Sequence, residues 1–165
     1  MFNDKPKTPQ IKISKDGKGV SSILFFLPEK REDAKVVNYL IKADNPIPGY
    51  TIGYVCNEKS KFYYPNSSKV KIITYKDDDL NYFGAIKSED LLDQIRSIQY
   101  DALVDLNTSF CAATSMLAFE LDIPLKIGFN SIIANETYTI TLERMENTFL
   151  ENNFQLIERL VGLKN

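Results

Sequence analysis

Residues 22–27 read Ser-Ile-Leu-Phe-Phe-Leu, and residues 100–106 read Tyr-Asp-Ala-Leu-Val-Asp-Leu. The first is a short continuous apolar run, typical of a strand covered on both faces, and the second is also predicted to be a buried strand. Pro28 ends the first run, and from Asp33 to Ile41 apolar residues recur at spacings of three and four. This spacing predicts an amphipathic helix with an acidic residue in its first turn.

The same alternation continues along the rest of the chain. Further strands are predicted at 50–56, 69–75, 124–129 and 137–142, and further helices at 88–98, 109–121 and 149–161. Ser88 is the expected N-cap of its helix, Gly162 is the expected stop of the last helix, and 62–65 is either a short helix or a loop. We therefore predict an α/β, Rossmann-like three-layer domain with a mostly parallel sheet and helices on both faces.

The length of 165 residues indicates one domain. Residues 1–19 carry five lysines, two prolines and two glycines, which predicts a flexible basic arm with at most a short edge strand at 11–14. Residues 20–165 are expected to form the single Rossmann-like domain.

Composition excludes several classes of function. The net charge of −2 and the pI of about 5.3 argue against nucleic acid as a partner. The chain has no histidine, which excludes histidine-dependent triads and most zinc sites, and both cysteines, Cys56 and Cys111, are expected to be reduced. No G-x-G-x-x-G or P-loop motif occurs, so we expect no cofactor and no metal. With no signal peptide and no apolar run long enough to span a membrane, we expect a cytoplasmic protein.

The best place for a ligand is the carboxyl edge of the predicted sheet, near the point where the strand order reverses. Two loops, 28–33 and 105–109, end there. The candidate site residues are Asp33, Asp105, Asn107, Thr108 and Ser109. Each also has a purely structural interpretation, because Asp33 favours a helix N-terminus, Asp105 can bond the amides of the next loop, and Ser109 can cap a helix.

Two segments resemble the acceptor-side domain of heptosyltransferase-like enzymes, glycosyltransferase family 9. They are SILFFLPEKREDAKVVNYLIK at 22–42 and YDALVDLNTSFCAATSMLAFELDIPLKIGF at 100–129, and the end of the last helix, 160–163, is also similar. The resemblance places Asp33 on the base that activates the acceptor hydroxyl and implies half of a GT-B fold. The family's glycine before that aspartate is Glu32 here, and its arginine at the end of the first strand is Leu27. The chain also resembles small stand-alone proteins of Bacteroidota.

The resemblance covers an acceptor domain without a nucleotide-sugar domain, so we expect no enzymatic activity from this chain on its own. We predict a non-catalytic binding or protein-interaction module. The alternatives are an acceptor-binding subunit of a split glycosyltransferase, with Asp33 as base, and a small-ligand sensor. A homo-oligomer or a protein partner is expected to dock on the apolar helix 109–121 or on loops that carry Tyr63, Tyr64, Tyr82 and Phe83.

Overall fold

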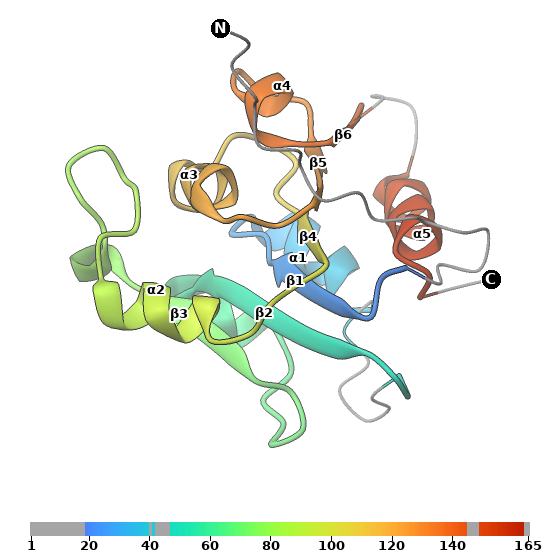
Figure 1. Ribbon diagram of the computed structural model, residues 1–165, viewed down its shortest axis with the longest axis horizontal. Helices are drawn as coiled ribbons and strands as arrows, with labels where there is room; N and C mark the ends of the chain where they lie inside the picture. The colour runs from blue at the N-terminus through green and yellow to red at the C-terminus, as the bar shows by residue number, and fades with distance from the viewer. Residues whose placement is uncertain (1–18, 40, 42–46, 145–148, 164–165) are drawn as a thin grey trace, which may run out of the picture.

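A parallel sheet with helices on both faces forms the protein in a computed structural model (Figure 1). The structure describes residues 19–39, 41, 47–144 and 149–163. The strands are β1 (Ser22–Phe26), β2 (Thr51–Asn57), β3 (Ile72–Tyr75), β4 (Ala102–Asp105), β5 (Leu125–Phe129) and β6 (Ile140–Leu142). The helices are α1 (Arg31–Val37), α2 (Glu89–Arg96), α3 (Ala112–Glu120), α4 (Ala134–Thr137) and α5 (Leu150–Leu160), with 3-10 turns η1 (Glu58–Tyr63) and η2 (Asp77–Asp79).

The strand order is β3-β2-β1-β4-β5-β6, and every neighbouring pair is parallel. Phe26, at the end of β1, lies beside Val55 of β2 on one side and Asp105 of β4 on the other. From β1 the chain adds β2 and β3 on one side of β1, and it then adds β4, β5 and β6 on the other side. The switch point is therefore the gap between β1 and β4, where the loops that follow these two strands diverge to opposite faces. This topology confirms the predicted α/β Rossmann-like class.

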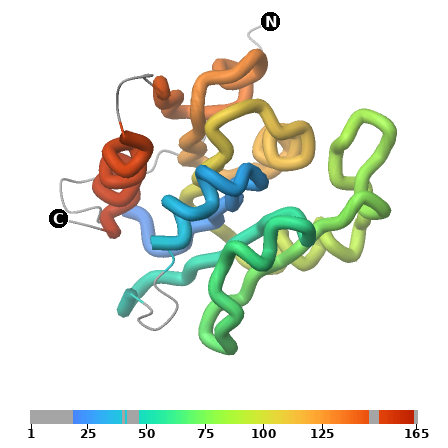
Figure 2. Tube along the Cα trace, turned by 180° about the vertical axis from the view of Figure 1, so that it is seen from behind, coloured from blue at the N-terminus to red at the C-terminus, as the bar shows by residue number. Residues whose placement is uncertain are grey.

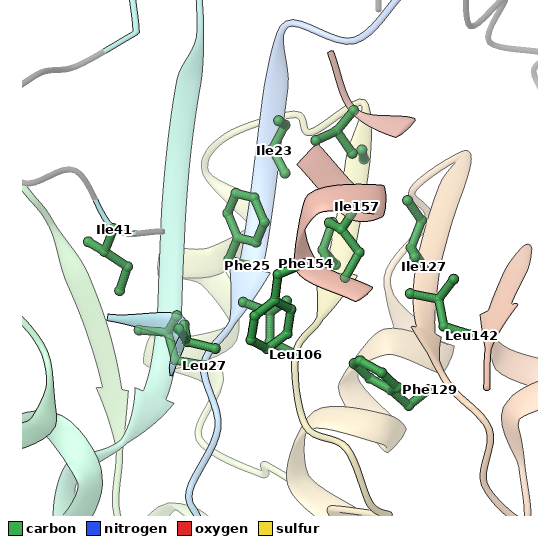
Figure 3. Close-up of a cluster of buried hydrophobic side chains, with 14 of the residues drawn as sticks. Ile23, Phe25, Leu27, Ile41, Leu106, Ile127, Phe129, Leu142, Phe154 and Ile157 are labelled. Carbon is green, nitrogen blue, oxygen red and sulfur yellow. The ribbon is translucent and has the colours of Figure 1, made fainter. Parts of the chain in front are cut away.

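Side chains of the strands alternate between two apolar layers. Phe25 and Val104 face the layer covered by α1 and α5, to which Phe154 and Ile157 contribute from α5 (Figure 3). Figure 2 shows α1 and α5 on that side of the sheet. Leu24, Phe26 and Leu103 face the opposite layer, which α2 and α3 cover. Burial of both faces explains why the strand sequences are continuous apolar runs instead of alternating ones.

Several predicted boundaries were wrong by a few residues. The first helix begins at Arg31, two residues before Asp33, and it ends at Val37, so buried Ile41 lies beyond it. The third helix begins at Ala112, because Cys111 has an extended backbone (φ −123°, ψ 114°), and Ser109 therefore does not cap it. Ser88 does occupy the N-cap position of α2, although its side chain makes no capping hydrogen bond.

The remaining predicted elements are a strand near the C-terminus, the segment 62–65, the end of the last helix and the N-terminal arm. The strand predicted at 137–142 is shorter, because residues 134–137 form the helical turn α4 before β6. The segment at 62–65, left open between helix and loop, lies partly in the 3-10 turn η1. Gly162 has a positive φ of 75° directly after α5 and ends that helix as predicted. The edge strand predicted at 11–14 and nearly all of the 1–19 arm lie outside the described residues.

Within the described ranges, no helix combines the length and the apolarity that crossing a bilayer requires.

Gly128 of β5 packs directly against the ring of Tyr138, in the connection between β5 and β6. A Cβ atom at position 128 would lie 2.5–2.7 Å from three carbons of that ring. Tyr138 cannot easily swing aside, because its hydroxyl donates a 2.8 Å hydrogen bond to Asp105. We predict that Gly128→Ala lowers the free energy of unfolding by about 1–3 kcal/mol through overpacking, measured by urea denaturation. Lys126→Ala, on the same side of the strand, is the control, and equal stability of the two variants would contradict this packing.

Candidate functional site

Asp105 is the centre of a hydrogen-bond network at the end of β4. Its carboxylate is 2 % exposed. One oxygen accepts from the backbone amide of Asn107 (3.0 Å) and from its side-chain amide (2.8 Å), and the other accepts from Tyr138 (2.8 Å). The bond from the Asn107 amide is the local turn that the sequence predicted as the structural role of Asp105. The carboxylate thus joins the loop after β4 to the connection between β5 and β6.

Asp33 lies in α1 beside the same loop and is also buried, at 3 % exposure. Thr108 donates a 2.5 Å hydrogen bond to one carboxylate oxygen of Asp33. The guanidinium of Arg144, which follows β6, lies 3.6 Å from the other oxygen and donates to the Thr108 hydroxyl at 3.0 Å. Two predicted site residues, Asp33 and Thr108, therefore meet across the switch point, and the half-exposed side chain of Arg144 contacts both of them.

Asn107, which donates to Asp105, also connects the loop after β4 to Glu29 in the loop after β1. Its side-chain oxygen accepts a hydrogen bond from the backbone amide of Glu29 at 3.3 Å. The Glu29 carboxylate accepts from the Asn57 side chain at 3.0 Å and from the Tyr75 hydroxyl at 2.6 Å. The loops after β1 and β4 are therefore tied to each other and to the last residues of β2 and β3 along the carboxyl edge.

Ser109 was predicted as a site residue, but it does not join the network around Asp33 and Asp105. It is exposed, and in the described part of the chain it is not a hydrogen-bond partner of Asp33 or Asp105. Arg144, Tyr138, Glu29 and Tyr75 complete the site but were not predicted. Glu29 lies in the candidate loop 28–33 but was not predicted as a site residue, whereas Tyr75, Tyr138 and Arg144 lie on or beside other strands, and no local motif marks them.

Burial governs the ionisation of this network. It raises the pKa of Asp105, although hydrogen bonds from Asn107, Tyr138 and Thr114 oppose the shift. It also raises the pKa of the Tyr138 and Tyr75 hydroxyls and of the Cys111 thiol, which lies 3.8 Å from the Tyr75 hydroxyl. The phenols and the thiol stay neutral at pH 7, and the thiol is not activated as a nucleophile.

Among residues 19–39, 41, 47–144 and 149–163, no group of three Cys, Asp or Glu side chains is arranged to hold a metal ion. Cys56 and Cys111 are both free thiols, as predicted, and burial raises the pKa of Cys56 to about 12.

A second feature is an exposed apolar surface on the opposite side of the sheet from α1. We call it the aromatic face, and its members are Tyr82 (98 % exposed), Phe83 (81 %), Phe110 (44 %), Met116 (36 %) and Phe119 (55 %). The loop that carries Tyr82 and Phe83 projects beside α3 (Figure 1). The two segments touch, since a Cβ on Gly84 would lie 3.1 Å from the Cβ of Ala112, and Ala85 and Met116 line one shallow depression.

Of the four aromatic residues predicted to lie at the surface, Tyr82 and Phe83 are exposed as expected, Tyr63 is half-buried, and the expectation was wrong at Tyr64. Tyr64 is 5 % exposed, and its hydroxyl donates a 2.6 Å hydrogen bond to the carbonyl of Pro28. The prediction failed because a buried tyrosine with a partner for its hydroxyl has the same sequence signature as an exposed one.

Comparison of the chain with family models, with curated proteins and with solved structures finds no match in any of the three.

The raised pKa of Asp105 predicts a specific pH dependence. The folded state holds this proton more tightly than the unfolded state, so the stabilisation is complete below the ordinary pKa of 3.8 and is lost as the pH rises through the folded value. Asp105→Asn keeps the shape of the side chain without ionising. We therefore expect its free energy of unfolding, relative to the native protein, to increase between pH 4 and pH 8 in urea titrations.

Asp101 provides a control of opposite sign. Burial would raise its pKa, but hydrogen bonds from Ser21 and Ser22 outweigh this and lower it. Asp101→Asn should therefore lose stability relative to the native protein as the pH rises. If Asp105→Asn and the native protein had parallel profiles of stability against pH, the raised pKa of Asp105 would be contradicted.

Proposed function

We propose that this protein is a cytoplasmic binding module, without catalytic activity of its own, that docks a protein partner on the aromatic face. The observation that supports this most directly is the exposure of five large apolar side chains on two adjacent segments, the loop before α2 and the region of α3. Contiguous exposed apolar surface of this kind marks interaction sites in folded proteins, and aromatic residues and methionine are enriched at interfaces.

The loop is organised for this role. The side-chain oxygen of Asn81 accepts hydrogen bonds from the amides of Phe83 (2.9 Å) and Ala85 (3.0 Å), and Leu80 pairs with Ile86 in an antiparallel bridge. The rings of Tyr82 and Phe83 contact each other edge to face at 5.6 Å. Aromatic side chains held on an ordered loop lose less conformational entropy on binding than side chains on a flexible one.

Core packing does not account for the exposed side of α3. Ala113, Leu117 and Ala118 already bury the inner side of this helix against the sheet. Met116 and Phe119 lie on the outer side, where a helix that only covers a sheet normally carries polar residues. The carboxyl edge, by contrast, has its aspartates bonded to other side chains, which leaves neither Asp33 nor Asp105 free to act as a base.

Site-specific photo-cross-linking tests this proposal in the cells that make the protein. A photoreactive phenylalanine analogue at Phe83 or Phe119 should give a discrete adduct, whereas the same analogue at Tyr39, which is 86 % exposed near the end of α1, should give none. Met116→Arg should abolish the adduct, and Leu156→Arg, at an exposed apolar position of α5, should preserve it. Failure to form an adduct, or equal labelling at all three positions, would reject the aromatic face as a docking site.

The carboxyl edge supports a second candidate, the acceptor-binding subunit or ligand sensor implied by the resemblance to glycosyltransferase family 9. The observation in its favour is that Asp33, Thr108 and Arg144 meet at the switch point, where open α/β sheets bind ligands. In this role Arg144 would move onto an anionic group of the ligand and free Asp33.

A thermal-shift screen with sugar phosphates and nucleotide sugars tests the second candidate. A ligand at one hundred times its Kd should stabilise the fold by about 2.7 kcal/mol. The shift should disappear in Asp33→Asn and in Arg144→Ala, and persist in Leu156→Arg. No shift with any of these compounds would count against ligand binding at this edge.

A further inference from the structure

We infer that a separate protein docks on the aromatic face through a short basic segment, whose arginine or lysine side chains lie over the exposed rings and pair with the acidic residues beside them. This inference rests on the proposed function, because it names the chemistry of the segment that occupies the same surface. Three features favour it: the negative charge around the face, the depression between its two segments, and its limited area.

Negative charge is concentrated in the two segments that form the aromatic face. Residues 77–93 and 109–122 carry eight aspartates and glutamates and one lysine, although the net charge of the whole chain is only −2. Glu89, Asp90 and Glu120 are exposed, and within the described ranges none of the three has an ion-pair partner. A cationic segment is therefore attracted to this face, whereas an acidic protein, a nucleic acid or an anionic membrane is repelled.

Glu120 is the acidic residue whose position fold stability does not explain. It is the last residue of α3, where the negative end of the helix dipole disfavours a carboxylate. It borders the shallow depression between the loop and the helix, whose apolar lining residues are Ala85, Ile86, Met116 and Leu117. An arginine or lysine side chain fits this arrangement, because its hydrocarbon stem covers apolar surface while its charged end pairs with a carboxylate.

The rings of Tyr82 and Phe83 offer a second contact for a cation. They are 98 % and 81 % exposed and lie on the loop between the acidic residues 77–79 and 89–90. The face of an aromatic ring attracts a guanidinium or ammonium group, and arginine is enriched at the centres of interfaces. A basic segment thus uses the rings and the carboxylates together, whereas a purely apolar segment uses the rings alone.

The area of the aromatic face suits a short segment better than a folded domain. Its four aromatic residues, at their exposed fractions of 98, 81, 44 and 55 %, offer roughly 400–700 Å². Each side of a stable interface between folded proteins buries about 800 Å². The face falls short of this area, so we expect charge pairs to supply part of the affinity and salt to weaken it.

Fluorescence anisotropy of the full chain with short labelled peptides tests this inference. One probe contains arginine and leucine spaced by serine and glycine, and its matched control has glutamate in place of every arginine. The arginine probe should bind at least about tenfold more tightly, and its affinity should fall as the salt concentration rises. Equal binding of the two probes, or no binding of the arginine probe at any concentration, overturns the inference.

Charge reversal places the binding site on the aromatic face. Asp90→Lys combined with Glu120→Lys should weaken binding of the arginine probe at least about tenfold, because two attractive charges become repulsive. Glu32→Lys combined with Glu151→Lys makes the same change in net charge at exposed positions in the first turns of α1 and α5, and it should leave the affinity unchanged. Circular dichroism melts check that each variant is folded. Equal affinity of the Asp90/Glu120 variant and the native chain contradicts the inference.

Photo-cross-linking at Phe119 separates this inference from the proposed function. An adduct that forms in the native chain and survives the Asp90/Glu120 reversal would mean that the face docks a partner by other contacts, so the inference alone fails. If no adduct forms, the proposed function fails too. An adduct with the mass of two copies of this chain would assign the basic segment to the chain's own lysine-rich residues 1–19 and overturn the assignment to a separate protein.

Discussion

The burial of one carboxylate, that of Asp105, constrains the whole carboxyl edge of the sheet. A carboxylate taken out of water destabilises the fold unless hydrogen bonds replace its hydration. Asn107 and Tyr138 provide these bonds, and each of them is thereby fixed in place. Fixing Asn107 positions the loop after β4, which orients Thr108 toward Asp33 and links to the amide of Glu29. Fixing Tyr138 places its ring over Gly128, where only glycine leaves enough room.

The sheet was predictable from sequence because its signal is local. Continuous apolar runs such as 22–27 are required wherever both faces of a strand are covered, and the intervening amphipathic segments imply crossovers that keep the strands parallel. The turn from Asp105 to Asn107 was also predictable, because its hydrogen bond joins residues only two positions apart and is therefore a local feature of the sequence. The contacts of Asp105 with Tyr138 and of Thr108 with Arg144 span 33 and 36 residues, and they depend on how β4, β5 and β6 are placed side by side.

Helix boundaries were less predictable because tertiary contacts compete with local propensity. Ser109 is a good N-cap residue by type, yet the chain stays extended through Cys111 before α3 begins. The side chain of Asn107 bonds Asp105 and also lies 3.4 Å from the hydroxyl of Thr114, in the first turn of α3. The helix start is thus set by the network around Asp105, which a propensity for capping cannot reveal.

The two candidate surfaces differ in whether their side chains already have partners, and this difference supports the proposal of a binding role over a catalytic one. At the carboxyl edge the buried aspartates already have donors, so a ligand must first break existing hydrogen bonds and displace Arg144 before it gains any. At the aromatic face nothing must be broken: apolar side chains are in water, and their burial against any complementary surface is favourable in proportion to area. The loop that presents Tyr82 and Phe83 is already ordered by Asn81, which removes much of the entropic cost of that burial. An internally bonded polar edge beside an ordered, exposed apolar face is the contrast that supports the proposed binding role of the aromatic face.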